Sequence, residues 1–159
     1  MNLFTVNMLL AVVWATLTAT ITLSSLLTGY VIGYAALWVA SPLFGGSNGY
    51  FVRVFRVIRL IGYFLYELAA SSIRVTWDVL TPTDRSNPKI VEVPLDVDSD
   101  TEVLLVTSLI SLTPGTLSLD VSPDRKTLKV HAMFADNPDE VVHDIKTGME
   151  RMVKEVFQP

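Results

Sequence analysis

The sequence predicts an α-helical membrane hairpin and an interfacial amphipathic helix, followed by a small α+β domain with the element order β-α-β-β-α. Three observations predict this fold class. The first 52 residues contain no Asp, Glu, Lys, Arg or His. The next stretch has apolar and polar side chains on opposite helical faces, and the composition then becomes acidic and turn-rich. We expect a hairpin in residues 1–44, the amphipathic helix and a linker in 45–85, and a cytoplasmic domain in 86–159.

The apolar region over residues 3–44 is long enough for two membrane spans, since about 20 helical residues cross a hydrocarbon core about 30 Å thick. Hydroxyl side chains gather in its middle, so we expect helices over 3–20 and 26–43 with a very short turn. The glycine-rich loop at 45–49 ends the second helix. A cleaved secretory signal fits poorly, because no basic residue precedes the apolar run, which continues far beyond 15 residues.

The second predicted span carries small residues at helical spacing. Gly29 and Gly33 lie four positions apart, and we expect Ala36 and Ala40 to continue the same stripe. Small side chains let two helix backbones approach closely, which matters in lipid because apolar burial does not drive helix association there. The stripe therefore predicts packing against the first span, a contact with another subunit, or both.

Residues 50–80 form the amphipathic helix. Its polar side chains fall within an arc of about 120° at 100° per residue: Arg53, Arg56, Arg59, Tyr63, Glu67, Ser71, Arg74 and Asp78. Cytoplasmic flanks of spans are enriched in Lys and Arg. We therefore expect Arg53, Arg56 and Arg59 to contact anionic lipid headgroups on the cytoplasmic side, with the helix lying on the membrane surface.

A third span is the alternative for this helix, because residues 60–80 are long enough to cross and contain only three charged side chains. Glu67 would then be an intramembrane carboxylate, which is a candidate for handling protons or cations. On the interfacial interpretation, Glu67 is a solvated or headgroup-level carboxylate on an ordinary polar face.

The sequence patterns in the last 75 residues predict a compact α+β domain. Residues 89–97 alternate as a strand, and Ser99 with Glu102 forms a capping-box pattern that starts a helix. Thr113-Pro114-Gly115 ends that helix. A hairpin of strands over 116–121 and 127–134 follows, and a final amphipathic helix begins after Asn137.

Composition excludes several function classes. The chain has no cysteine, and His131 and His143 have no partner at metal-ligand spacing, so we expect no catalytic residues, no cofactor and no metal site. From residue 81 onward there are 8 basic and 14 acidic side chains, a net charge of −6, which argues against a nucleic-acid partner.

Four stretches carry a family resemblance. They are SLISLTPGTLS at 108–118, Val-His-Ala at 130–132, LTGYVIGY at 27–34 and YELAASSI at 66–73. Together they resemble the E-type subunits of the bacterial Mrp (Mnh) multisubunit monovalent cation/proton antiporters. The resemblance covers essentially the whole chain, and the LTPGT-centred stretch is its most specific part.

The resemblance implies a component of a large assembly in the bacterial inner membrane that exchanges sodium, or another monovalent cation, for protons. The implied partners are large multi-span subunits and membrane lipid. We expect an accessory, non-catalytic subunit that supports assembly or stability, because the two predicted spans contain no ionisable side chain to form a pathway. The alternative is a stand-alone membrane-anchored adaptor whose acidic domain recruits a soluble partner.

Overall fold

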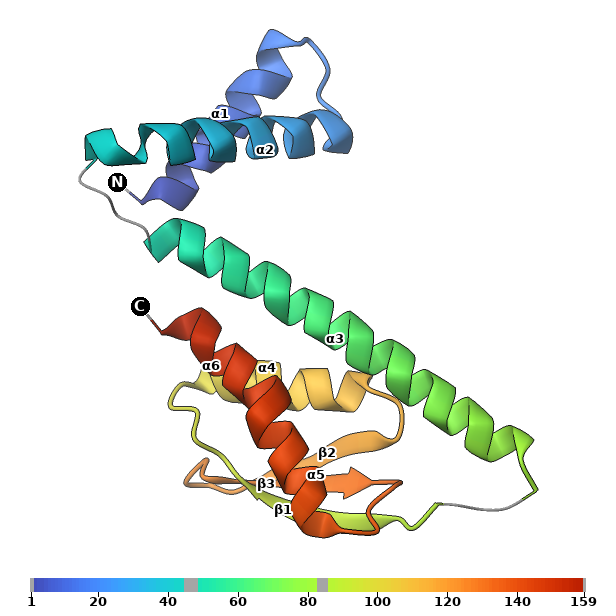
Figure 1. The fold of residues 1–159 in the computed structure, drawn as a ribbon. Coiled ribbons are helices and arrows are strands. Elements are labelled where there is room, and N and C mark those ends of the chain that lie inside the picture. Colours follow the sequence, from blue (N-terminus) through green and yellow to red (C-terminus); the bar gives the residue numbers. More distant parts are fainter. Residues whose placement is uncertain (1, 45–48, 83–85, 159) are drawn as a thin grey trace. The chain divides into compact units, whose positions relative to one another are not determined.

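The computed structural model describes residues 2–44, 49–82 and 86–158. The chain forms two compact units, Met1–Val54 and Phe55–Pro159 (Figure 1). Residues 45–48 of the glycine-rich loop and residues 83–85 of the predicted linker lie outside the described residues. The unit boundary falls inside one long helix, so most of the amphipathic helix belongs to the same unit as the α+β domain.

Two antiparallel helices form most of the first unit, α1 (Leu3–Leu17) and α2 (Leu23–Ala40). The first helix begins at residue 3 as predicted, but it ends at Leu17 instead of residue 20, and α2 covers Leu23–Ala40 instead of 26–43. Hydroxyl groups set the end of α1 and the start of α2. The Thr18 hydroxyl donates to the Trp14 carbonyl at 2.9 Å, and the chain turns at Ala19 with a φ of 53°. The Thr22 hydroxyl accepts a hydrogen bond from the Ser25 amide at 3.2 Å, which caps α2.

Among the described helices, α2 is the one long and apolar enough to cross a membrane by itself. The 15 residues of α1 are apolar but extend only about 22 Å at 1.5 Å per residue, less than a hydrocarbon core of about 30 Å. After α2, Ser41–Phe44 form a 3-10 turn. The two-span hairpin remains a prediction.

The long helix α3 (Gly49–Leu80) has 32 residues and begins within the first unit. From Phe55 onward it is part of the second unit. There, Leu60 is buried in the core of the α+β domain, and Tyr63 and Phe64 pack against that core. The helix therefore lies along the domain instead of standing apart from it.

The domain contains the predicted order of elements: β1 (Lys89–Pro94), α4 (Asp100–Leu112), β2 (Thr116–Val121), β3 (Thr127–Ala132) and a C-terminal helical region. The strands form an antiparallel sheet in the order β1-β3-β2, with β3 in the centre. The C-terminal region comprises α5 (Pro138–Ile145), a π-helical turn over Lys146–Glu150, and α6 (Arg151–Phe157). The helices cover one face of the sheet (Figure 1).

The core lies between that sheet face and the helices. Alternation in β1 and β3 directs one set of side chains inward, so Val91, Val93, Leu128 and Val130 are buried. Val106 and Ile110 of α4 and Val153 of α6 pack against them. The predicted single C-terminal helix is interrupted by the π-helical turn, in which Gly148, Met149 and Glu150 are all buried.

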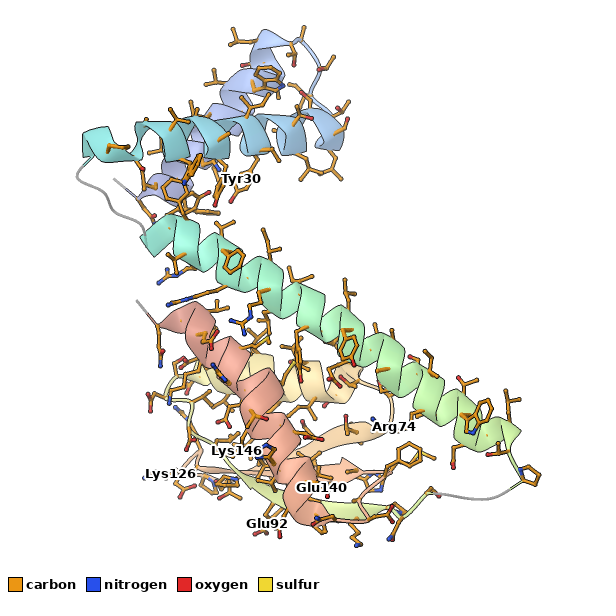
Figure 2. All side chains as sticks on the ribbon, viewed as in Figure 1. Tyr30, Arg74, Glu92, Lys126, Glu140 and Lys146 are labelled. Carbon is orange, nitrogen blue, oxygen red and sulfur yellow. The ribbon has the colours of Figure 1, made fainter. Side chains whose placement is uncertain are left out.

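The buried Glu150 is satisfied by hydrogen bonds and charge. Its carboxylate accepts a hydrogen bond from the Asp96 amide and lies 3.4 Å from the Lys146 ammonium. Lys146, labelled in Figure 2, also contacts the Asp96 carboxylate at 2.8 Å and donates to the Pro94 carbonyl at 2.7 Å. These contacts tie the π-helical turn to the end of β1, where an unpaired buried carboxylate would be strongly destabilising.

The predicted capping box of α4 is confirmed. The Glu102 amide donates to the Ser99 hydroxyl at 3.3 Å, and the Glu102 carboxylate accepts from the Ser99 amide at 2.9 Å. Burial alone would raise the pKa of Glu102, but the hydrogen bonds from Ser99 lower it below its usual value of 4.5. The ionised carboxylate is therefore the form that caps the helix.

We expect Glu102→Gln to destabilise the domain near pH 7 by about 1 kcal/mol, a typical value for a helix cap. Because the folded-state pKa is lowered, the carboxylate contributes stability above about pH 4.5, and this contribution is lost as the pH falls through the folded-state value. Thermal unfolding of the full chain in detergent should therefore show a difference between wild type and variant at pH 7 that shrinks as the pH falls below about 4.5. A difference independent of pH would contradict this account.

Candidate functional site

The glycines of α2 face α1. A Cβ built on Gly29 would lie 2.8 Å from the Cβ of Trp14 and 3.0 Å from the backbone of Ala11, which is closer than side chains tolerate. A Cβ on Gly33 would overlap the Oδ1 of Asn7. The two glycines therefore permit the close approach of α1 and α2 within this unit.

The remaining small residues of the expected stripe lie differently. Ala36 is exposed, Ala40 is half-buried, and Leu37 is the next buried position after Gly33. The buried stripe thus follows four-residue spacing through Gly29, Gly33 and Leu37, so Ala36 is available for lipid or a partner instead of α1.

Asn7 is a polar residue at this interface that the sequence patterns did not single out. It is fully buried, and its Nδ2 donates to the Tyr50 hydroxyl at 2.8 Å. The Tyr50 hydroxyl lies 2.9 Å from that of Tyr30, so the network joins α1, α2 and the start of α3. The Asn7 Oδ1 has no conventional hydrogen-bond partner in the described part of the chain and lies against the backbone of Gly33. An amide inside an apolar helix is the signal that could have identified it.

Two of the three arginines expected at lipid headgroups have protein partners. The Arg56 guanidinium donates to the backbone carbonyls of Glu155 at 2.8 Å and Gln158 at 2.7 Å. Arg59 forms an ion pair with the Glu155 carboxylate at 3.2 Å. The carbonyls at a helix C-terminus carry partial negative charge, which explains why a neighbouring guanidinium binds them. Arg53 is exposed. Headgroup contact remains a prediction for all three arginines.

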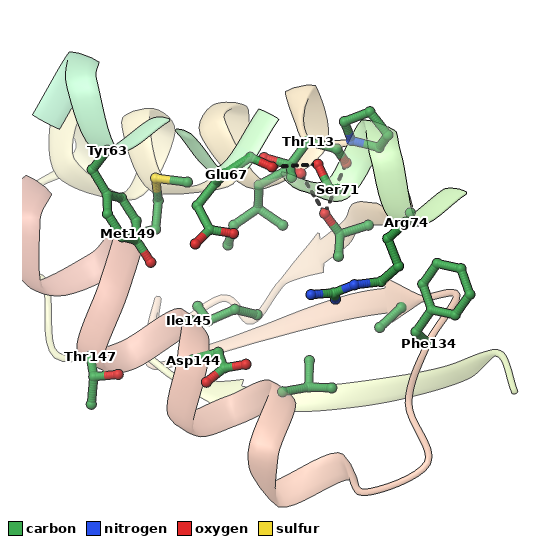
Figure 3. Close-up of a pocket in the computed structure, with 16 residues that line it drawn as sticks. Tyr63, Glu67, Ser71, Arg74, Thr113, Phe134, Asp144, Ile145, Thr147 and Met149 are labelled. Atoms are coloured by element: carbon green, nitrogen blue, oxygen red, sulfur yellow. Dashed lines mark hydrogen bonds between the residues drawn. The ribbon is translucent and has the colours of Figure 1, made fainter. Parts of the chain in front are cut away.

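The polar face of α3 also differs from the expectation of a solvated surface. A pocket of about 310 Å³ lies between this face and the α+β domain. The side chains of Tyr63, Glu67, Ser71 and Arg74 line it from α3 (Figure 3). From the domain, the lining includes the Thr113–Thr116 turn, Phe134 and Asp144. Glu67 therefore lies on the side of α3 that faces the domain.

The family-motif turn Thr113-Pro114-Gly115 forms one wall of this pocket. The Thr113 hydroxyl donates to the Leu109 carbonyl at 2.9 Å, and the Thr116 hydroxyl donates to the Ile110 carbonyl at 2.7 Å, so both hydroxyls satisfy carbonyls at the end of α4. Gly115 has a φ of +90°, a backbone conformation that favours glycine, and a Cβ there would be in ordinary van der Waals contact with Val75 of α3 at 3.6 Å. The motif is therefore more than a helix stop, because the turn lies against α3.

The charged side chains of the pocket are of mixed sign. Figure 3 shows the guanidinium of Arg74 and the carboxylates of Glu67 and Asp144 directed into it. None of the three takes part in an ion pair within residues 49–82 and 86–158. No group of three His, Cys, Asp or Glu side chains in those ranges or in 2–44 is arranged to hold a metal ion. The arrangement suits a ligand that carries both a positive and a negative group.

Gly148 in the π-helical turn makes room for Tyr63. A Cβ at this position would overlap the Tyr63 hydroxyl and lie 3.0 Å from the ring carbon that bears it. We expect Gly148→Ala to weaken the packing of α3 on the domain by about 1–3 kcal/mol, as for overpacked sites. Thermal unfolding of the full chain should show this loss, and Tyr63→Phe should restore part of it. Absence of any coupling between the two substitutions would contradict the proposed contact.

Comparison with known proteins gives consistent matches. A family model described as a Na+/H+ ion antiporter subunit matches residues 7–156. An E-type Na+/H+ antiporter subunit of Alkalihalophilus pseudofirmus is 38% identical over 94% of both chains. An E1-type Na+/H+ antiporter subunit of Staphylococcus haemolyticus is 32% identical over 94% of both chains.

Solved structures also resemble the chain. A chain of the Mrp complex from a Dietzia species has a TM-score of 0.51 and 26% identity, with coverage of 65% of this chain and 97% of that one. A chain of the membrane-bound sulfane sulfur reductase, an archaeal respiratory membrane complex, has a TM-score of 0.58 and 24% identity over 98% of both chains. The second likeness extends the fold over nearly the whole chain.

Proposed function

Because this chain belongs to the family of E-type Na+/H+ antiporter subunits, we propose that it is an accessory subunit that supports assembly of an Mrp-type antiporter complex without itself carrying ions. It is a membrane-associated component of a transporter whose partners are other membrane subunits. In this proposal, the helical hairpin anchors the subunit, and the α+β domain stands on the cytoplasmic side with α3 along the membrane surface.

The packing of α3 is the observation that carries this proposal. Its polar side chains from Tyr63 to Arg74 face the α+β domain, while large apolar side chains on its other side are exposed, among them Phe55, Ile61 and Trp77. A helix packed along a folded domain with charged surfaces cannot cross the hydrocarbon core without taking that domain into it. A position at the interface buries the exposed apolar face in lipid and keeps the domain in water.

The same packing bears on Glu67. On a crossing helix it would be a candidate for proton or cation handling. Glu67 lines the pocket beside the α+β domain, so in the proposed position of α3 it lies at the level of water and headgroups. The described helices α1 and α2 contain no ionisable side chains apart from tyrosines. These features support a role in assembly instead of a role in ion conduction.

Deletion of the subunit tests the proposal. Membranes from cells that lack it should contain less assembled antiporter and show correspondingly less sodium/proton exchange in everted vesicles. The purified chain alone in liposomes should exchange neither sodium nor protons, because a hairpin and a surface helix enclose no pathway. Exchange by the chain alone would overturn the proposal, as would full assembly in its absence.

The orientation has its own test. The positive-inside rule places Arg53, Arg56 and Arg59, and hence both termini, on the cytoplasmic side. A cysteine introduced at Asn2 should resist a membrane-impermeant reagent in intact cells and react after the membrane is opened. Labelling from outside intact cells would contradict this orientation.

A further inference from the structure

We infer that the pocket between α3 and the α+β domain is a binding site for a zwitterionic aminophospholipid, with Arg74 holding the phosphate and Glu67 and Asp144 holding the primary amine. This inference rests on the proposed position of α3 at the membrane surface. It adds the binding of one specific lipid class to the general contact with the bilayer that is proposed for α3.

Arg74 lies between two differently lined cavities. One is the pocket of about 310 Å³, whose mixed lining contains the carboxylates of Glu67 and Asp144. The other is an apolar groove of about 260 Å³, lined by Ala70, Ile73 and Trp77 together with Arg74 and Asp78. A pocket with charged groups that shares one cationic side chain with an apolar groove matches a ligand with a charged head and a hydrocarbon tail.

The groove belongs to the face of α3 that would enter lipid. Ile73 is 69% exposed and Trp77 is 60% exposed, so both side chains are available to an acyl chain. Tryptophan is favoured at the level of lipid headgroups because its ring is apolar with one polar edge. A lipid beside α3 could therefore lay its chain along Ile73 and Trp77 while its headgroup reaches the pocket.

The charges of the pocket decide the class of headgroup. Arg74 offers a planar set of donors that suits a phosphate, and it forms no ion pair in the described structure. Glu67 is half-buried and Asp144 is directed into the pocket from α5 (Figure 3). One cation with two carboxylates complements a phosphate joined to an ammonium group and disfavours a headgroup that carries only negative charge.

One of the hydroxyl groups that line the pocket contacts a charged side chain, and two others bind the backbone. The Ser71 hydroxyl donates to the Glu67 carbonyl at 2.6 Å, and the Thr116 hydroxyl donates to the Ile110 and Thr113 carbonyls at 2.7 and 3.1 Å. The Tyr63 hydroxyl is hydrogen-bonded to the Glu67 side chain. The carboxylate of Glu67 keeps further lone pairs that can accept from an amine, so the charged side chains are still able to recognise a ligand.

Native mass spectrometry of the full chain in mild detergent tests the inference. Phosphatidylethanolamine and phosphatidylglycerol with identical acyl chains are the probes. We expect the wild type to retain phosphatidylethanolamine preferentially. Arg74→Gln should lower its affinity by about tenfold or more, as expected for loss of a charged hydrogen-bonding group, and Arg74→Lys should lose less. Arg125→Gln, which removes an exposed arginine of the same domain outside the pocket, is the matched control.

Two further measurements separate the parts of the site. Glu67→Gln combined with Asp144→Asn should remove the preference for ethanolamine over glycerol headgroups while lipid is still bound. Soluble glycerophosphoethanolamine should compete far more weakly than the intact lipid, because it lacks the chain that fills the groove. If glycerophosphoethanolamine competes as strongly as the intact lipid, the ligand of the pocket is a soluble phosphoamine and not a lipid. That result would overturn the inference.

The inference is also overturned if Arg74→Gln and Arg125→Gln have the same effect on lipid retention, or if wild type retains both lipids equally. These failures can be told apart from failure of the proposed function, because the depth of α3 in the bilayer is measured separately by spin labels, one of them at Phe55, which lies outside both the pocket and the groove. Normal depth with no specific lipid would leave the surface position of α3 intact.

Discussion

Gly33→Leu should abolish the close packing of α1 on α2 and with it the assembly of the antiporter complex. A side chain at this position overlaps Asn7 Oδ1 and comes within 3.2 Å of Leu10, so the helices must separate. Overpacking typically destabilises by about 1–3 kcal/mol. Replacing glycine in a helix by leucine gains less than about 1 kcal/mol in helix propensity, so the packing loss dominates. The measurement is the yield of complete complex after gentle purification.

Ala36→Leu is the matched control, because Ala36 lies less than one turn from Gly33 on the same helix but is exposed. It should leave the α1–α2 packing intact. If Ala36→Leu reduces assembly and Gly33→Leu does not, Ala36 contacts another subunit. Normal assembly of the Gly33→Leu variant would show that the α1–α2 contact is dispensable. Asn7→Leu should have an intermediate effect, because it removes the hydrogen bond to Tyr50 but keeps an apolar side chain.

Arg56→Glu should release α6 from α3. The substitution removes two hydrogen bonds from a charged donor, each worth about 1.5–3 kcal/mol. It also puts a carboxylate beside the helix C-terminus, where negative charge is unfavourable by about 0.3–1 kcal/mol. Partial solvent access reduces these values, so we expect a net loss of about 2 kcal/mol. Hydrogen exchange of the amides in α6 should accelerate accordingly, by about 30-fold.

Arg53→Glu separates this effect from lipid contact. Arg53 is exposed on the same helix one turn earlier, and the same charge change there should leave exchange in α6 unaltered. It should instead reduce binding of the chain to vesicles that contain anionic lipid, if Arg53 contacts headgroups. Equal effects of the two substitutions on both measurements would contradict the assignment of Arg56 to α6.

Much of the α+β domain could be predicted from local patterns. The Ser99–Glu102 capping box and the two strands of the 116–134 hairpin each carry their signal within a few residues, and the structure contains all of them. The π-helical turn at 146–150 could not be predicted in this way. It is stabilised by long-range contacts of Glu150 and Lys146 with the end of β1, which no helical periodicity reveals.

The pocket shows a second limit of sequence patterns. Periodicity correctly grouped Tyr63, Glu67, Ser71 and Arg74 on one face of a helix, but it cannot say whether water, lipid or protein covers that face. Asp144 and the Thr113–Thr116 turn reach the same pocket only through tertiary folding. The same holds for Arg56, whose partners Glu155 and Gln158 lie about 100 residues away in the sequence.

The position of α3 on the membrane surface is the central claim, and its depth in the bilayer is the most direct test. The chain has no cysteine, so single spin labels can be attached through Phe55→Cys and Trp77→Cys on the exposed apolar face. These positions are 22 residues apart, or about 33 Å along a helix. A surface helix predicts that both labels lie at the same shallow depth, within about 10 Å of the headgroup boundary. Labels on opposite sides of the bilayer, or one at its centre, would contradict the account and make α3 a third span.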